Sequence, residues 1–113
     1  MDWKKRLDDT SAALNTFRKA RPETGKGFTT LHHAAMGEGS MTVREKELVA
    51  LGIGIAQQCE DCIGFHLQAA VRAGATREDV ADTISVAVMM GGGPSYMYGA
   101  RALQAYDQLF GES

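Results

Sequence analysis

Two cysteines and one histidine are the residues of this sequence whose types and spacing could do chemistry. The cysteines are spaced C-x-x-C, at Cys59 and Cys62, and His66 follows four residues after the second. In a helix, at about 100° per residue, the three side chains would fall within about 60° of one another on one face. Two thiols and a base on a single stripe suit thiol redox chemistry.

Each of these residues has a chemical role that its position allows. A cysteine reacts as its thiolate, and an unperturbed thiol pKa of about 8.5 leaves most of it protonated at neutral pH. His66, at i+4 from Cys62, could accept or return the proton. Cys59 could resolve a sulfenic acid or mixed disulfide formed on Cys62 by closing a Cys59–Cys62 bond. The spacing therefore indicates a redox-active pair.

The charges beside the two cysteines act in opposite directions on the thiols. A helix that begins near Cys59 would favour the thiolates through its N-terminal dipole. Glu60 and Asp61, which separate the cysteines, add negative charge that raises a thiol pKa. The sequence does not decide between these two effects.

Two other interpretations of the cysteines stay open at this level. Together with His66 they could supply three zinc ligands, and His32 or His33 a fourth. A second C-x-x-C or an H-x-x-x-H cluster, which structural zinc sites usually contain, is absent from the sequence. The cysteines could also be incidental buried residues. One of the two adjacent histidines would line the thiol site if its helix packs over it.

Length and composition indicate one small globular domain spanning residues 1–113. The chain is 44% hydrophobic and 23% charged, with a net charge of −2, so no basic surplus favours nucleic acid. No apolar run reaches the roughly 20 residues of a membrane span. Residues 1–9 are charged and have no apolar core, so we expect no signal peptide. We therefore predict a cytoplasmic protein, a setting where paired cysteines are more often catalytic or metal-binding than structural.

The hydrophobic pattern predicts an all-α domain of about six helices, with no hairpin signals or alternating strands. Thr42 with Glu45, and Thr76 with Asp79, fit capping boxes at two helix starts. Gly52 and Gly54 lower helix propensity, which suggests that another backbone packs closely there. The expected elements are helices at about 2–20, 28–36, 42 to the bend, the bend to 73, 76–91 and 95–110, with a loop at 22–27.

Glu47 is the fourth candidate residue, and its role depends on the path of the chain. In one straight helix over 42–73, Glu47 would lie roughly 18 Å from Cys59, too far to act. If the chain reverses near Gln57 and Gln58, Glu47 lies about 16 Å along one arm and His66 about 12 Å along the other. The carboxylate could then orient the imidazole. The alternative is a solvated helix carboxylate.

The combination of Glu47, Cys59, Cys62 and His66 resembles the alkylhydroperoxidase D (AhpD-like) branch of the carboxymuconolactone decarboxylase family. The resemblance covers about residues 40–106 and includes the segments AGATREDV at 73–80 and MMGGGP at 89–94. It implies an all-helical fold assembled as trimers or hexamers, with sites near subunit contacts. It also implies that Cys62 reacts with peroxide through a sulfenic acid, that Cys59 is its partner, and that Glu47 and His66 relay protons.

The resemblance leads to a thiol-dependent peroxidase or disulfide reductase that needs no bound cofactor or metal. Its expected partners are a small hydroperoxide or disulfide, an external dithiol reductant and further copies of the chain. The chain has Asp61 where well-studied members have a histidine, and it matches one of their two helical halves. The alternatives are a non-catalytic oligomeric module that binds zinc or senses redox state, and an acid–base enzyme of the decarboxylase type using Glu47 and His66.

Overall fold

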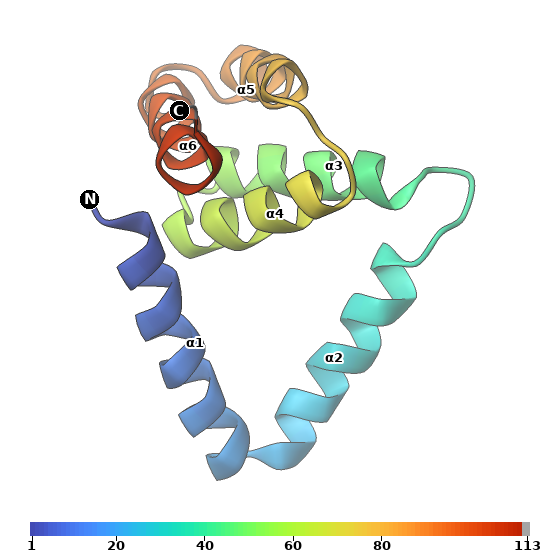
Figure 1. The fold of residues 1–113 in the computed structure, drawn as a ribbon. Coiled ribbons are helices and arrows are strands. Elements are labelled where there is room, and N and C mark those ends of the chain that lie inside the picture. Colours follow the sequence, from blue (N-terminus) through green and yellow to red (C-terminus); the bar gives the residue numbers. More distant parts are fainter. Residues whose placement is uncertain (112–113) are drawn as a thin grey trace.

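Six helices build the chain in the computed structural model, which describes residues 1–111. The all-α expectation is confirmed: no strand occurs within these residues. None of the helices described is both long enough and apolar enough to cross a membrane. The elements, drawn in Figure 1, are α1 (Trp3–Ala20), α2 (Pro22–Met36), α3 (Val43–Ala56), α4 (Glu60–Arg72), α5 (Arg77–Gly91) and α6 (Gly93–Phe110).

The starts of α1, α3 and α5 are set by polar side chains, and those at α3 and α5 form the capping boxes that the sequence indicated. Asp2 accepts a hydrogen bond from the amide of Lys5 at the start of α1. Thr42 and Thr76 each close a complete capping box, with Glu45 and Asp79 respectively. Because these contacts satisfy amides that the first helical turn leaves without partners, each helix begins at a defined residue.

The hydrophobic core lies where α3, α4, α5 and α6 pack together, and the start of α1 completes it. Trp3 at the beginning of α1 is fully buried in this cluster, although α1 leaves the core soon afterwards. The buried members of the cluster are Trp3, Leu51, Ile55, Ile63, Leu67, Val80, Ala87, Ala102 and Ala105. Burial of a large aliphatic side chain contributes about 1.5–3 kcal/mol, so this cluster holds the four helices in place.

Helices α1 and α2 form a V that opens toward α3 and α4 (Figure 1). Trp3 and Leu7 of α1 are buried, but the later members of its apolar stripe, Leu14 and Phe17, are 41% and 50% exposed. Helix α2 buries none of its side chains. The V therefore extends from the core as an arm whose apolar side chains face the space between its two helices or solvent.

The predicted loop at residues 22–27 is wrong, because α2 already begins at Pro22. A proline is favourable in the first helical turn, where its missing N–H would have had no partner. Arg21 is the single residue between the end of α1 and the start of α2. Gly25 lies against Arg18 of α1 and the helix continues through Gly27, so these glycines lower helix propensity without ending the helix.

The chain reverses between α3 and α4, as the second of the two proposed paths required. Helix α3 ends at Ala56 and α4 begins at Glu60, so one straight helix over 42–73 is excluded. Gln58 makes the turn with a φ of 58°, the one non-glycine residue in the left-handed region among those described. The Cys59 amide then donates to the Gly54 carbonyl at 2.9 Å, which closes the turn.

The two glycines of α3 have different surroundings. A Cβ atom on Gly54 would lie 3.1 Å from the Cβ of Cys62 and 3.5 Å from the backbone nitrogen of Ile63. The expected close approach of a second backbone is therefore confirmed at Gly54, where α4 crosses. A Cβ atom on Gly52 would make only an ordinary 3.5 Å contact with the Thr83 side chain. The same expectation at Gly52 is wrong.

We predict that Gly54→Ala lowers the free energy of unfolding relative to Gly52→Ala. Both variants gain up to about 1 kcal/mol of helix propensity. Only the methyl group at position 54 must displace Cys62, and such overpacking typically costs about 1–3 kcal/mol. Urea unfolding of the two variants under reducing conditions measures the difference, and equal midpoints would contradict the close packing.

An ion pair between the last two helices supplies a pH-dependent contribution to stability. Arg77 of α5 donates from Nε and Nη2 to the two carboxylate oxygens of Asp107 in α6, at 2.9 and 3.0 Å. The hydrogen bond from the Arg77 guanidinium lowers the pKa of Asp107. A lowered folded-state pKa means that the pair stabilises the fold at pH values above the ordinary carboxyl pKa.

We expect the stabilisation by Asp107 to be complete above about pH 4 and to be lost as the pH falls through the lowered pKa of the folded protein. Asp107→Asn should therefore show a smaller loss of stability than the wild type on acidification below about pH 4. Arg77→Met, which removes the donor, should flatten the profile in the same way. Urea midpoints across the acid range measure it, and three parallel profiles would argue against the pair.

Candidate functional site

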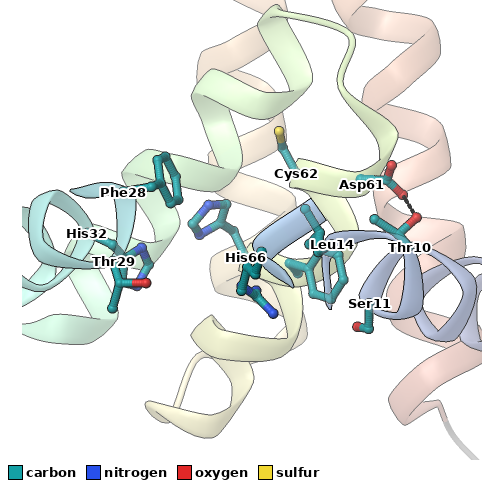
Figure 2. Close-up of a pocket in the computed structure, with 11 residues that line it drawn as sticks. Thr10, Ser11, Leu14, Phe28, Thr29, His32, Asp61, Cys62 and His66 are labelled. Carbon is teal, nitrogen blue, oxygen red and sulfur yellow. Dashed lines mark hydrogen bonds between the residues drawn. The ribbon is translucent and has the colours of Figure 1, made fainter. Parts of the chain in front are cut away.

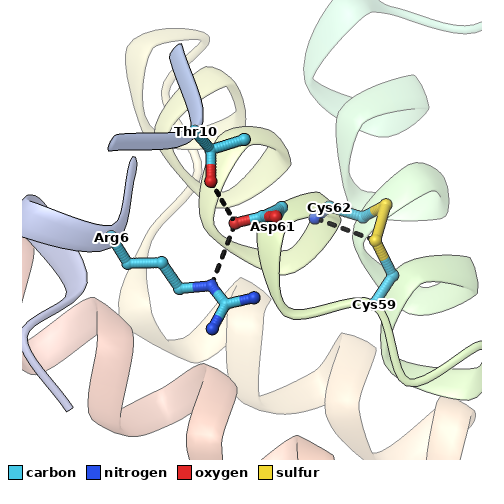
Figure 3. The surroundings of a disulfide bond; sticks show 5 residues. All are labelled: Arg6, Thr10, Cys59, Asp61 and Cys62. Atoms are coloured by element: carbon cyan, nitrogen blue, oxygen red, sulfur yellow. Dashed lines mark hydrogen bonds and ion pairs between the residues drawn. A yellow bond between two sulfur atoms is a disulfide. The ribbon is translucent and has the colours of Figure 1, made fainter. Parts of the chain in front are cut away.

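The two cysteines are joined by a disulfide at the start of α4 (Figure 3). Cys59 is the N-cap residue of α4, in extended backbone conformation, and its Sγ accepts a hydrogen bond from the Cys62 amide at 3.2 Å. The sequence placed Cys59 on the same helical stripe as Cys62 and His66. It instead precedes the helix, and its side chain acts as the cap. Its sulfur therefore lies at the positive end of the helix dipole.

His66 and Glu47 meet across the α3–α4 contact. His66 Nδ1 lies 2.7 Å from Glu47 Oε1, so the carboxylate is not the solvated group of the alternative interpretation. Glu47 is 5% exposed, whereas about a quarter of the His66 side chain is exposed. A carboxylate only accepts hydrogen bonds, so it favours the tautomer with a proton on Nδ1. Nε2 is then the ring atom left free for chemistry.

A groove between α1, α2 and α4 contains Cys62 and His66 (Figure 2). Its volume is about 590 Å³, and neither Cys59 nor Glu47 lines it. Cys62 is therefore the cysteine of the pair that lines the groove. The other lining residues are Thr10, Ser11, Leu14, Arg18, Phe28, Thr29, His32, Asp61 and Phe65. Because Leu14, Phe28 and Phe65 give the wall apolar surface beside several polar groups, the groove suits a small organic molecule.

The two histidines of α2 have different positions. His32 is half-buried and lines the groove, as expected if its helix packs over the thiols, whereas His33 is exposed. Among residues 1–111, no three His, Cys, Asp or Glu side chains are grouped so as to hold a metal ion. The proposed set of Cys59, Cys62, His66 and a fourth histidine is thus not assembled in this structure.

Helix α1 supplies residues to the site that the sequence reasoning missed. Arg6 and Thr10 bind Asp61 beside the cysteines, while Thr10, Leu14 and Arg18 line the groove. The four residues are spaced at intervals of four, which places them along one side of a helix. That spacing was the available signal, but nothing in the sequence showed which helix this side would face.

Comparison with known proteins identifies the family to which this fold belongs. Residues 22–105 match the model of the carboxymuconolactone decarboxylase family. Two bacterial relatives of uncharacterized function align over nearly the whole chain. One, from Cupriavidus necator, is 35% identical over 96% of both chains. The other, encoded in the cox locus of Paracoccus denitrificans, is 33% identical over 93% of this chain and 95% of its own. The chain belongs to the carboxymuconolactone decarboxylase family.

Solved structures extend the comparison to three dimensions. A family member from Legionella pneumophila superposes with a TM-score of 0.92, at 43% identity over 97% of both chains. A family member from Thermotoga maritima gives a TM-score of 0.82, at 27% identity over 92% of this chain and 89% of its own. The Thermotoga protein is described with a suggested role in an antioxidative response. Within this family fold, the present chain carries the C-x-x-C pair.

We predict that His66→Leu destabilises the protein by leaving the Glu47 carboxylate buried without its partner. An unsatisfied buried polar group costs about 1–3 kcal/mol. The double variant Glu47→Leu/His66→Leu removes both polar groups and should recover most of that loss. Urea unfolding of the reduced proteins measures both. If the single and double variants unfold at the same midpoint, the two side chains are not energetically coupled.

Proposed function

We propose that this protein is a thiol-dependent peroxidase or disulfide reductase of the AhpD-like branch. The observation that carries the proposal is the position of Cys62. Cys62 lines a groove together with His66, is bonded to Cys59, and precedes by about one helical turn an imidazole held by a buried carboxylate. A nucleophile, a resolving thiol and an oriented base are the groups that a two-thiol peroxidase requires.

In the first proposed step, reduced Cys62 attacks a hydroperoxide bound in the groove. His66, through Nε2, takes the thiol proton while Glu47 stabilises the imidazolium that forms. The thiolate sulfur then bonds to the terminal peroxide oxygen and the O–O bond breaks. The alkoxide leaves with the proton returned by His66, as an alcohol. The products are one alcohol and a sulfenic acid on Cys62.

In the second step, Cys59 resolves the sulfenic acid. The Cys59 sulfur attacks the Cys62 sulfur, the S–O bond breaks, and the oxygen leaves as water with the Cys59 proton. The Cys59–Cys62 disulfide is the bond that this proposed step would form. An external dithiol then reduces it through a mixed disulfide and becomes a disulfide itself. The same exchange chemistry would serve a disulfide substrate.

The proposed partners follow from this cycle. A small hydroperoxide or disulfide enters the groove, and a dithiol reductant restores the thiols, which suits the reducing conditions of the cytoplasm. The cycle uses no bound cofactor. We also propose that copies of the chain assemble, as trimers or hexamers. Large apolar side chains on α3, α5 and α6 support this, because Ile53, Val86, Met90 and Tyr96 are 53–75% exposed.

The test is the addition of one equivalent of an alkyl hydroperoxide to the fully reduced protein, followed by a count of free thiols. We expect two thiols to be lost per peroxide. Cys62→Ser should abolish turnover, and Cys59→Ser should gain the mass of one oxygen on Cys62. His66→Asn should lower the rate by about 10²–10⁴-fold, the usual contribution of a general acid or base.

Two results would contradict the proposal. One is survival of both thiols after peroxide treatment and after treatment with a small disulfide. The other is turnover that persists in the double variant Cys59→Ser/Cys62→Ser, since that would assign the chemistry to Glu47 and His66 as an acid–base pair.

A further inference from the structure

Two carboxylates lie between the cysteines, and their charges oppose a thiolate. Glu60 and Asp61 occupy the first turn of α4, immediately beside the disulfide. A like charge close to an ionising group disfavours its charged form. With both carboxylates unpaired, Cys62 would therefore form its thiolate less readily, and the reduced pair would be less stable relative to the disulfide.

Arg6 and Thr10, one turn apart on α1, bind the Asp61 carboxylate (Figure 3). Arg6 Nε and the Thr10 hydroxyl both donate to Asp61 Oδ1, each at 2.9 Å. Arg6 also reaches Glu60, with Nη1 2.9 Å from Oε1, and Arg101 of α6 pairs with the other Glu60 oxygen. Arg6 and Arg101, from two different helices, thus balance the negative charges of Glu60 and Asp61.

We propose that Arg6 and Thr10 are positioning residues that neutralise and fix Asp61, and thereby keep Cys62 available as a thiolate. This rests on the proposed thiol function, but it concerns a property of the thiol that does not depend on any substrate. Arg6 acts mainly through charge, while Thr10 directs the carboxylate toward α1. Helix α1 would therefore take part in setting the reactivity of a cysteine on α4.

The position of α1 allows this role. Arg6 lies between Trp3 and Leu7, the two buried residues that anchor α1 to the core. The hydrogen bond to Asp61 raises the pKa of the Arg6 guanidinium, so Arg6 is charged at every pH at which a thiol titrates. The side chains of Arg6 and Asp61 are 37% and 35% exposed, so solvent screens the pair only in part.

Other charged or titratable groups also surround Cys62, and a test must separate their effects from those of Arg6 and Thr10. Arg18 of α1 and His32 of α2 line the same groove, as does His66, which is paired with Glu47 of α3. None of these is bonded to Asp61. Replacement of Arg6 therefore changes the charge beside Asp61 and Glu60 and leaves the groups across the groove unchanged, while Arg101 still pairs with Glu60.

The experiment measures the pH dependence of iodoacetamide alkylation in a Cys59→Ser background, where Cys62 is the single thiol. Arg6→Met should raise the midpoint by about 1 pH unit, the lower end of the effect of a nearby opposite charge, equivalent to a roughly tenfold slower reaction below the midpoint. Asp61→Asn should lower the midpoint. Thr10→Val should raise it by less than Arg6→Met does.

Charge rescue distinguishes this role from a merely structural one. The double variant Arg6→Met/Asp61→Asn should return the midpoint close to that of the parent, because the unpaired carboxylate is gone. Lys5→Met is the matched control: it removes a cation from α1 that pairs with Asp9 on the same helix, and it should leave the midpoint unchanged. With both cysteines present, Arg6→Met should also shift the equilibrium with glutathione toward the disulfide.

An unchanged midpoint in Arg6→Met, or no rescue by Asp61→Asn, would overturn the proposal. Because neither alkylation nor glutathione equilibration needs a peroxide, these readouts stay valid if the protein fails to consume peroxides. Conversely, normal peroxide turnover with an unaltered Cys62 midpoint in Arg6→Met would overturn this inference alone.

Discussion

Glu47 and His66 can meet only because α3 and α4 run back along each other in close contact. The turn at Gln58 and the hydrogen bond from the Cys59 amide to Gly54 bring α4 directly against α3. A methyl group at position 54 would lie 3.1 Å from the Cys62 Cβ, so Cys62 would have to move back to accommodate it. This contact sets the register between the two helices. It therefore positions the cap, the disulfide and the carboxylate–imidazole pair together.

The start of α4 combines two electrostatic effects that are usually considered separately. The helix dipole and the amide of Cys62 act on the sulfur of Cys59. The carboxylates of Glu60 and Asp61 also occupy the first turn, where acidic side chains favour helix formation. Arginines from α1 and α6 pair with them. In the proposed thiol chemistry, the acidic residues that favour the start of the helix would depend on these arginines to neutralise their charge.

Much of the fold was predictable because its signals are local. Capping boxes at Thr42 and Thr76 depend on residues three positions apart, and both occur as expected. The clearest error is the loop predicted at 22–27, where the glycines and the proline were interpreted as signals that end a helix. In the structure only Arg21 leaves the helical conformation between α1 and α2. The turn at Gln58 gave no local signal, because a left-handed conformation is most readily recognised from glycine or asparagine.

The site was predictable only where its members share an element or a simple path. The spacing of Cys62 and His66 is local, and Glu47 followed from one assumed reversal. Arg6 and Thr10 could not be placed, because they reach Asp61 from more than 50 positions away. The packing of Leu7 against Gly64 brings α1 to that position: a Cβ atom on Gly64 would lie 2.6 Å from a Leu7 methyl group. Nothing in the motif around the cysteines indicates that Leu7 packs against Gly64.

The short separation of the two cysteines has a thermodynamic consequence. The bond joins residues only three positions apart. In the chain-entropy model, closing so small a ring restricts the unfolded chain by about 2 kcal/mol, against about 4.7 kcal/mol for a ring of 100 residues. Opening this bond therefore removes less than half of the stabilisation that opening a ring of 100 residues would remove. In the proposed thiol cycle, each opening of the disulfide would therefore cost the fold less than the loss of a long-range bond.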